Sequence, residues 1–220
     1  MNWFTRTFTY SIGKKIIMAL TGIFLVTFLI EHLVGNLLLL AGDEGVAYAE
    51  YSHWAVNNPF IRTVEIVLVF GFLFHIVDGI ILTLQNKKAR GSGYVVNRRP
   101  SSYTSRNMII SGLVLLAFLG IHLASFFWPY RVSDVGHTDL FQVAVHKFKN
   151  PLFCGFYILS FILLGMHLWH GFSSAFQTIG MRHPKYYPAV KGLGYILAIG
   201  LPLGFAVIAL YFLLIYQIPA

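Results

Sequence analysis

The stretch IIMALTGIFLVTFLIEHLVGNLLLL, residues 16–40, is long and apolar enough to cross a bilayer, for which a helix needs about 20 residues. It is too long for the core of a signal peptide, and no small-residue cleavage site follows it, so we expect it in the mature protein. Four further stretches of this kind follow, at residues 61–84, 108–128, 152–176 and 193–216. The sequence therefore predicts an all-α membrane protein with five transmembrane helices in a single domain, residues 1–220.

Composition and charge agree with this class. The chain is 57% hydrophobic and only 11% charged, against about 25% charged residues in soluble domains. With the N-terminus inside, twelve basic residues lie on the inner side (Arg6, Lys14, Lys15, Lys87, Lys88, Arg90, Arg98, Arg99, Arg106, Arg182, Lys185 and Lys191) and four on the outer side (Arg62, Arg131, Lys147 and Lys149). This positive-inside pattern predicts a cytoplasmic N-terminus and explains the net charge of +8 without a nucleic-acid partner.

The connections between the apolar stretches differ in character. The inner loop at 86–107 is basic, and the outer loop at 42–58 is polar and aromatic. The outer loop at 129–150 is mixed in charge, and we expect a short amphipathic piece around residues 141–148.

Four of the apolar stretches each carry a histidine, namely His32, His75, His122 and His170. An ionisable side chain inside a bilayer is costly and usually marks a site. At a rise of about 1.5 Å per residue, His32 and His122 lie about 25 Å and 24 Å from the inner ends of their helices. His75 and His170 lie about 18 Å from theirs. Two histidine pairs at two depths can supply both axial ligands of two haem irons, which indicates a membrane electron carrier.

The histidines leave alternatives open. His167 lies three residues before His170 on nearly the same helix face, so either could be a ligand while the other bonds a propionate or a neighbouring helix. A two-histidine zinc site lacks an obvious third ligand. A haem-free transporter could use the histidines as a proton relay, although the sequence has no inverted repeats of the kind typical of transporters.

Short motifs around these histidines resemble one family. They are TGIFL at 21–25 before His32, FH at 74–75, LGIHL at 119–123, HLWHG at 167–171 and SAFQT at 174–178. Together with the helix count, the orientation and the histidine placement, they resemble the dihaem cytochrome b membrane anchor of succinate dehydrogenases and fumarate reductases, of the five-helix, single-anchor type. The resemblance covers nearly the whole chain.

The resemblance implies a four-helix core that holds two haem b groups, with a fifth helix beside it. His32 and His122 would ligate the iron of a distal haem near the outer face. His75 and His170 would ligate the iron of a proximal haem, and His170 is favoured over His167 because the family's ligand is followed directly by glycine, here Gly171. Both irons would then have two imidazole ligands, which suits electron transfer rather than oxygen chemistry.

The resemblance also implies the partners. In the family, a cytoplasmic flavoprotein subunit with FAD interconverts succinate and fumarate, an iron–sulfur subunit relays electrons, and the two haems carry them to a quinone, typically menaquinone. The chain would be the membrane subunit of a succinate:quinone oxidoreductase in the bacterial cytoplasmic membrane, with its inner basic loops docking the iron–sulfur subunit. Since Cys154 is the only cysteine, iron–sulfur clusters would be held by another subunit. The alternative within electron transfer is a dihaem cytochrome of another dehydrogenase, such as a hydrogenase or formate dehydrogenase.

Some relatives that oxidise menaquinol carry a glutamate two residues before the ligand of the fourth helix, and that position here is Leu168. The difference weakens the case for a compensating proton pathway and favours succinate oxidation.

Three glutamates are candidates for the quinone site, because a quinone exchanges protons along with its electrons. They are Glu31, Glu50 and Glu65. Glu50 could equally be a solvated loop residue, and Glu65 lies one turn from Arg62 and could pair with it. Asp78, three residues after His75, could orient that imidazole or meet a lysine near the inner face.

Overall fold

The computed structural model describes residues 11–90, 103–131 and 139–217, and within these the chain is helical, with no β-strand. The five long helices are α2 (Ser11–Leu37), α4 (Pro59–Arg90), α5 (Tyr103–His122), α8 (Pro151–Thr178) and α9 (Tyr187–Leu214). Together with the short helical continuations of α2 and α5, all five are long and apolar enough to cross a membrane. The prediction of an all-α, multi-pass membrane protein with five spanning helices is confirmed.

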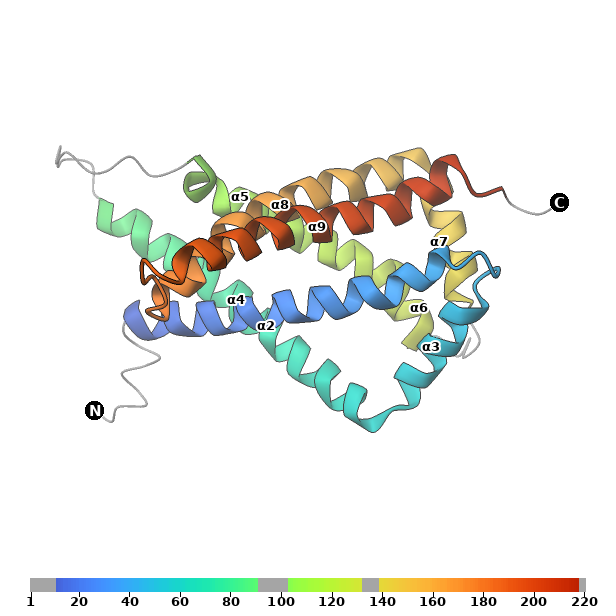
Figure 1. The fold of residues 1–220 in the computed structure, drawn as a ribbon, viewed down its shortest axis with the longest axis horizontal. Coiled ribbons are helices and arrows are strands. Elements are labelled where there is room, and N and C mark those ends of the chain that lie inside the picture. The colour runs from blue at the N-terminus through green and yellow to red at the C-terminus, as the bar shows by residue number, and fades with distance from the viewer. Residues whose placement is uncertain (1–10, 91–102, 132–138, 218–220) are drawn as a thin grey trace.

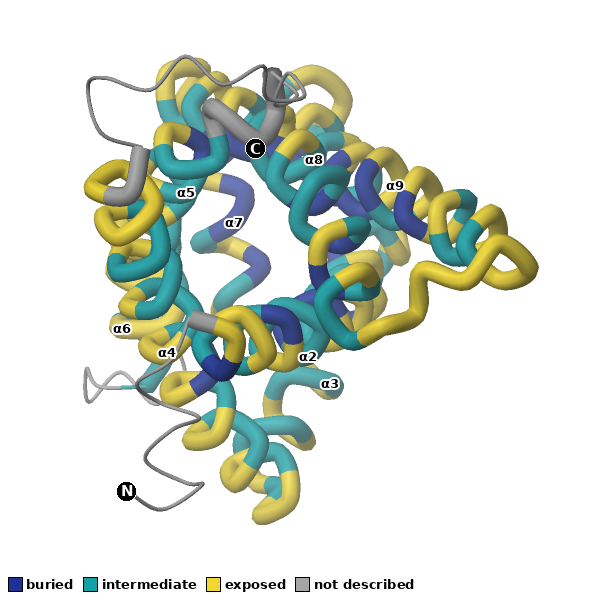
Figure 2. Tube along the Cα trace, turned by 90° about the vertical axis from the view of Figure 1, so that its left-hand side faces the viewer, coloured by how far each residue is buried: buried dark blue, intermediate teal, exposed yellow. Residues whose placement is uncertain are grey.

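The five long helices run roughly along the long axis of the molecule (Figure 1). α9 packs closely on α8, α2 contacts α4, α8 and α9, and α5 packs on α8. Viewed from the end, α2, α4, α5 and α8 surround a common axis, and α9 lies outside them against α8 (Figure 2). This agrees with the predicted arrangement of four core helices with a fifth beside them.

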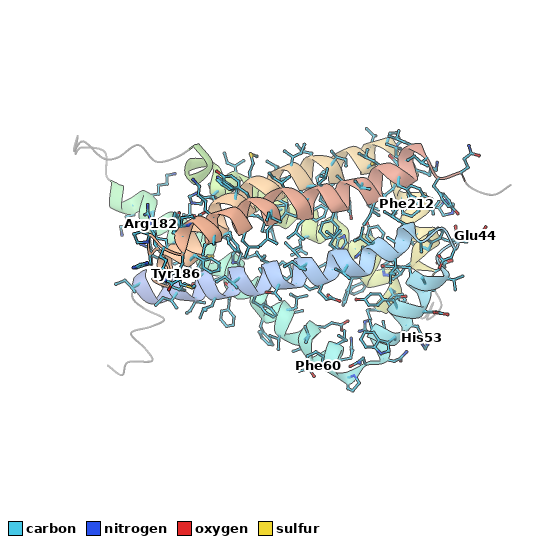
Figure 3. The ribbon with its side chains drawn as sticks, in the orientation of Figure 1. Glu44, His53, Phe60, Arg182, Tyr186 and Phe212 are labelled. Carbon is cyan, nitrogen blue, oxygen red and sulfur yellow. The ribbon has the colours of Figure 1, made fainter. Side chains whose placement is uncertain are left out.

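Labelled polar residues mark the two ends of the bundle (Figure 3). Arg182 and Tyr186 lie at the end where α9 begins, and Glu44 and His53 lie at the opposite end. The first end also carries the exposed Lys87 near the end of α4 and is the cytoplasmic side of the charge-based prediction. We call it the inner end, and the opposite one the outer end.

Three short helices cover the outer end: α3 (Val46–Asn57), α6 (Trp128–Arg131) and α7 (Leu140–Lys149). α7 begins at the cap formed by Asp139, whose side chain accepts hydrogen bonds from the backbone of Phe141 and Gln142. It buries Phe141 and Phe148 against the bundle, where both rings pack near Phe212. The amphipathic piece expected around 141–148 is confirmed. α3 lies where the sequence predicted only a loop.

The helix that carries His122 changes its winding directly after that residue. Residues Leu123–Phe127 form a π-helical turn, η2, before α-helical winding resumes at Trp128. The sequence predicted a single regular helix over 108–128. π turns are rare and occur frequently at functional sites.

α8 and α9 approach closely at a glycine. A Cβ atom on Gly165 would stand 2.7 Å from the carbonyl oxygen of Ala198. Pro202, four residues further on, has no N–H to donate to that carbonyl, which lies against Gly165 instead. Along the same interface Cys154 is buried, with its Sγ 3.7 Å from the carbonyl oxygen of Ala209. Small residues at this contact let the two helix backbones pack closely, as is typical of membrane helices.

Candidate functional site

The outer histidine pair joins α2 to α5. The ring centroids of His32 and His122 lie 5.7 Å apart, with an angle of 90° between the ring planes. Phe28 stacks on His32 at 5.2 Å, and Phe118 stacks on His122 at 5.7 Å. Phe205 of α9 lies 5.7 Å from the ring of His32. The two histidines that helix rise predicted at one depth are therefore neighbours within an aromatic shell.

Each histidine of the outer pair has one polar contact at its Nδ1 atom. The Nδ1 of His122 lies 3.3 Å from the hydroxyl of the buried Tyr157 on α8. The Nδ1 of His32 lies 3.3 Å from the amide nitrogen of Asn36, one turn later on the same helix, and that amide also donates to the carbonyl of His32 at 2.7 Å.

The inner histidine pair joins α4 to α8. The ring centroids of His75 and His167 lie 6.2 Å apart, at an angle of 63°. His170 lies one turn closer to the inner end of α8, is half-buried, and makes no hydrogen bond or ring contact with another described residue. The fold thus brings His75 next to His167, the histidine that the family resemblance disfavoured.

Both inner histidines contact a hydroxyl group on another helix. The Oγ1 of Thr21 on α2 lies 3.3 Å from the Nδ1 of His75, and the Oγ of Ser111 on α5 lies 3.3 Å from the Nδ1 of His167. The sequence reasoning missed both residues. Both were polar side chains inside apolar stretches, and Thr21 also begins the TGIFL motif, but nothing in the sequence connects Thr21 to His75 or Ser111 to His167.

The spacing within both pairs suits two axial ligands of one metal ion. Two imidazoles bound at about 2 Å on opposite sides of a metal have ring centres about 6 Å apart. The measured separations are 5.7 Å and 6.2 Å. Among the described residues no group of three or more His, Cys, Asp or Glu side chains lies together, as a zinc site would need. The donor sets therefore fit a group such as haem, which brings its own four equatorial ligands.

Glycines lie beside both rings of the inner pair. A Cβ on Gly22 would lie 3.5 Å from the Cε1 of His75, and one on Gly112 would lie 3.8 Å from the Cε1 of His167. Gly171, next to His170, has no described atom within 4 Å of its Cβ position. The inner pair therefore has little bulk at one edge of each imidazole, where a flat macrocycle needs room.

Glu31, the residue before His32, is exposed on α2 and pairs with a tyrosine. The hydroxyl of Tyr51 on α3 donates to its carboxylate over 2.5 Å. Burial, followed by the hydrogen bond and the charge of Glu31, raises the pKa of the Tyr51 hydroxyl above its ordinary value. The pair therefore holds a protonated phenol against a carboxylate on the α2 surface, next to the outer histidine.

Glu65 is engaged in ion pairs. Its carboxylate lies 2.6 Å from Arg62, as the spacing predicted, and 2.7 Å from Arg131 of α6. Both oxygens are thus held by arginines, which leaves this carboxylate poorly placed to exchange a proton.

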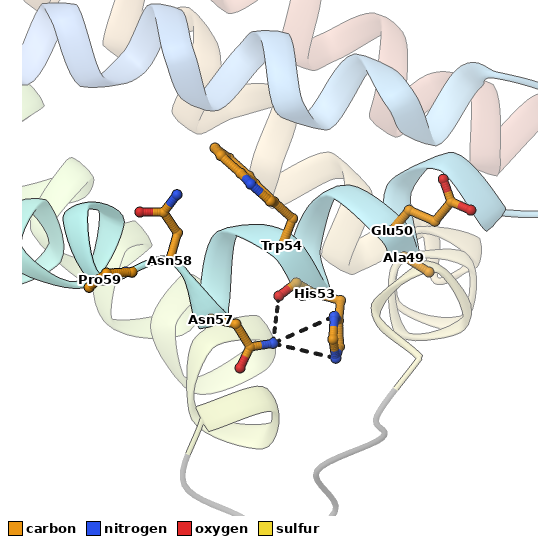
Figure 4. Close-up of a pocket in the computed structure, with 7 residues that line it drawn as sticks. All are labelled: Ala49, Glu50, His53, Trp54, Asn57, Asn58 and Pro59. Atoms are coloured by element: carbon orange, nitrogen blue, oxygen red, sulfur yellow. Dashed lines mark hydrogen bonds between the residues drawn. The ribbon is translucent and has the colours of Figure 1, made fainter.

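Glu50 lines an open groove of about 770 Å³ on the outer end. The groove follows α3, where Asn57 donates to the carbonyl oxygen of His53 and lies beside its ring (Figure 4). Trp54 also lines it. Glu31 thus reaches α3 through Tyr51, Glu50 lies on α3 next to that tyrosine, and Glu65 is held by two arginines.

Asp78 lies one turn after His75 on α4. Its Oδ2 atom is buried and has no hydrogen-bond partner among the described residues. Its carboxylate makes no hydrogen bond with the imidazole of His75, but it lies close enough to Lys14 of α2 for the two charges to interact. Of the two contacts considered for it, the structure thus favours the one with a lysine near the inner end.

The fold and the histidine pairs define a multi-pass helical membrane protein with two candidate two-histidine metal centres. Comparison with protein-family models, with curated proteins and with solved structures found no match to this chain.

Proposed function

We propose that the chain is the membrane anchor and electron-transfer subunit of a succinate:quinone oxidoreductase, and that it holds two b haems. The observation that carries the proposal is the meeting of two histidine pairs, each from two different spanning helices, at ring separations of 5.7 Å and 6.2 Å. When bound, the haems supply reversible one-electron transfer with no open coordination position.

The proposed ligands of the outer haem are His32 and His122. Aromatic rings on both histidines exclude water from this site, and a hydrophobic shell of this kind raises or lowers the potential of a bound metal by controlling the local dielectric. The buried Tyr157 hydroxyl orients His122 through its Nδ1 atom.

The proposed ligands of the inner haem are His75 and His167. The 6.2 Å ring separation and the contact of each Nδ1 with a hydroxyl support this pair. His170 is the alternative that the sequence motif favours. With His167 as the ligand, His170 would be available to hydrogen-bond a polar group of the haem, such as a propionate.

The proposed proton-exchanging group for the quinone is Glu31, with Tyr51 as its hydrogen-bond partner. Their 2.5 Å hydrogen bond is in the range of a charge-assisted O–H···O⁻ contact. The Glu31 side chain is exposed on the surface of α2, and the next residue is His32, a proposed haem ligand. Of the three glutamates, it alone combines access from the bilayer with closeness to a histidine pair.

The proposed docking face for an iron–sulfur subunit is the inner end. Exposed basic residues gather there between α8 and α9, near the start of α9 and at the end of α4, namely Lys87, Lys88, Arg182, Lys185 and Lys191. Three of them lie over tyrosine rings: Arg182 over Tyr187 at 5.4 Å, Lys185 over Tyr186 at 5.5 Å and Lys191 over Tyr195 at 5.9 Å. These contacts hold the charges in place for an acidic partner.

The proposed direction is succinate oxidation, with menaquinone as the quinone. Counted back two residues from His170, the position where some menaquinol-oxidising relatives have a glutamate is Leu168, which is buried in an apolar cluster with Val26, Ala198 and Leu201. Counted back from the proposed ligand His167, it is Gly165, which has no carboxylate either. An apolar contact of this kind gives no route for a proton.

A reduced-minus-oxidised spectrum of the detergent-purified complex, with haem quantification and succinate as reductant, tests the proposal. We expect two b haems per chain that succinate reduces. Absence of haem would reject the proposal and favour the alternative of a haem-free transporter that uses the histidines as a proton relay. Two haems that succinate leaves oxidised in an intact complex would assign the chain to another dehydrogenase.

A further inference from the structure

The inner histidine pair is supported from outside by two hydroxyl groups in matching positions. Thr21 of α2 reaches His75 of α4, and Ser111 of α5 reaches His167 of α8, each over 3.3 Å to Nδ1. Each contact crosses between helices, so it links the orientation of an imidazole to the packing of the bundle. Ser111 is 5% exposed, which keeps water from replacing it.

The position of the hydroxyl proton decides the direction of both hydrogen bonds. The Thr21 hydroxyl donates to the carbonyl oxygen of Ile17 at 2.8 Å, and the Ser111 hydroxyl donates to that of Met108 at 3.0 Å. A hydroxyl has a single proton, so each oxygen must then accept from the imidazole. The Nδ1 atoms of His75 and His167 are therefore the protonated ones, and their Nε2 atoms carry free lone pairs.

The outer pair has a different environment. His32 lies near an amide nitrogen of its own helix, and His122 lies near a phenol whose proton has no other described acceptor. Both of these neighbours can donate a hydrogen bond to Nδ1, so neither has to accept one from it. The Thr21 and Ser111 hydroxyls can only accept, because each already donates its proton to a carbonyl. A hydroxyl that already donates is also a stronger acceptor, because hydrogen bonds in a chain polarise one another.

We infer that Thr21 and Ser111 are positioning residues that fix the tautomers of His75 and His167 and lower the reduction potential of the metal centre these histidines hold. The inference rests on the proposed function, because it needs a redox metal between the two rings. A hydrogen bond accepted from Nδ1–H makes the imidazole a more basic ligand, and a more basic ligand stabilises the oxidised metal. Thr21 and Ser111 thus influence the reduction potential of the inner centre although neither side chain contacts the metal.

Thr21→Val and Ser111→Ala remove the hydroxyl acceptors with little change in volume, while the backbone carbonyl of Met18, which also accepts from His75, stays in place. The readouts are the haem count, the two reduction potentials from a redox titration, and the electron paramagnetic resonance spectrum of the oxidised haems. We expect two haems in each variant and a rise in the potential of one haem only. The rise should reflect about a tenfold change in its reduction equilibrium, which is 59 mV for a one-electron couple. The spectrum of that haem should change with it.

The chain offers matched controls. Thr27→Val removes an exposed hydroxyl of α2 that donates to the carbonyl of Ile23, and Ser160→Ala removes a buried one of α8 that donates to that of Phe156. Neither contacts a histidine, so both variants should keep wild-type potentials and spectra. Thr21→Ser and Ser111→Thr retain the acceptor and should also resemble the wild type.

The outcomes separate the inference from the proposed function. Wild-type protein without haem rejects the proposed function. Wild-type protein with two haems, whose potentials and spectra ignore Thr21→Val and Ser111→Ala, overturns only the inference. A response to one of the two substitutions alone overturns the paired arrangement. Loss of a haem in Thr21→Val supports the inference if Thr21→Ser restores it, and opposes it if Thr21→Ser does not.

Discussion

Arg131 holds both carboxylate oxygens of Glu65 at 2.7 Å, across 66 residues of sequence. The contact joins α6, which continues the helix of His122, to the first part of α4, the helix of His75. The Arg131 side chain is only 14% exposed, whereas that of Arg62, the other partner of Glu65, is 53% exposed. The two ion pairs of this carboxylate should therefore differ in their contribution to stability.

Arg131→Gln should destabilise the protein by about 1–2 kcal/mol, because it removes two charge-assisted hydrogen bonds from a partly buried carboxylate. Arg62→Gln is the matched control and should cost less than about 0.5 kcal/mol, as exposed ion pairs do. Thermal unfolding in detergent measures both. Equal losses would mean that burial does not distinguish the two arginines.

Alanine at each proposed axial histidine should remove one haem of two. His32→Ala and His122→Ala should lose the same haem, and His75→Ala should lose the other. For the fourth ligand the two candidates predict opposite results. If His167 is the ligand, His167→Ala retains a single haem while His170→Ala keeps both, and haem quantification on the purified variants distinguishes them. A haem lost in His170→Ala and kept in His167→Ala would restore the assignment that the sequence motif favours.

Glu31→Gln should lower succinate:quinone reductase activity by about 10²-fold, the lower range for loss of a general acid or base. Tyr51→Phe removes the 2.5 Å hydrogen bond and should lower it less. Both variants should keep two haems and full reduction of a water-soluble acceptor by succinate. Glu50→Gln is the control and should retain quinone activity. An active Glu31→Gln variant would remove this carboxylate from the quinone site.

The pKa of Tyr51 makes a separate prediction. Burial and the neighbouring carboxylate raise it above the ordinary value near 10, so the phenol stays protonated throughout the neutral range. Because a raised pKa favours the neutral form, the Tyr51 contribution to quinone activity should be constant between about pH 6 and pH 9, since this whole range lies below the ordinary value. The ratio of wild-type to Tyr51→Phe activity, measured across this range, should stay level.

Gly165→Ala should destabilise the α8–α9 contact, because the added Cβ would meet the Ala198 carbonyl at 2.7 Å and a backbone atom cannot move aside. Overpacking of this kind costs about 1–3 kcal/mol. Gly155→Ala, on the same helix, adds a methyl group into open space and should be tolerated. Thermal stability of the two variants provides the comparison, and an unaffected Gly165→Ala would show that the helices can separate without loss.

The spanning helices could be predicted because hydropathy and length are local properties of the chain. Their ends could not, because apolar sequence marks the hydrocarbon region rather than the end of helical winding. α9 starts at Tyr187, six residues before the predicted span at 193, through the polar and aromatic segment that includes Lys191. α3 was missed because it lies in a polar segment without a clear apolar face.

Helix rise grouped the histidines by depth but could not choose between His167 and His170, which share a face of α8. That choice depends on how α4 packs beside α8. The same holds for Thr21 and Ser111, whose partners lie 54 and 56 residues away on other helices. Residue types and depths are therefore available from sequence, whereas contacts across the bundle are not.

The π turn at Leu123–Phe127 determines the direction around the helix axis in which the side chains after it project. A π turn takes up about one residue more than an α turn, and one residue corresponds to about 100° around the axis. Deleting one residue from this turn would restore regular winding and swing Arg131 away from Glu65, while His122 upstream kept its direction. The extra residue of the π turn therefore sets the direction of Arg131 around the helix axis separately from that of His122. It allows one continuous helix to place His122 beside His32 and Arg131 beside Glu65.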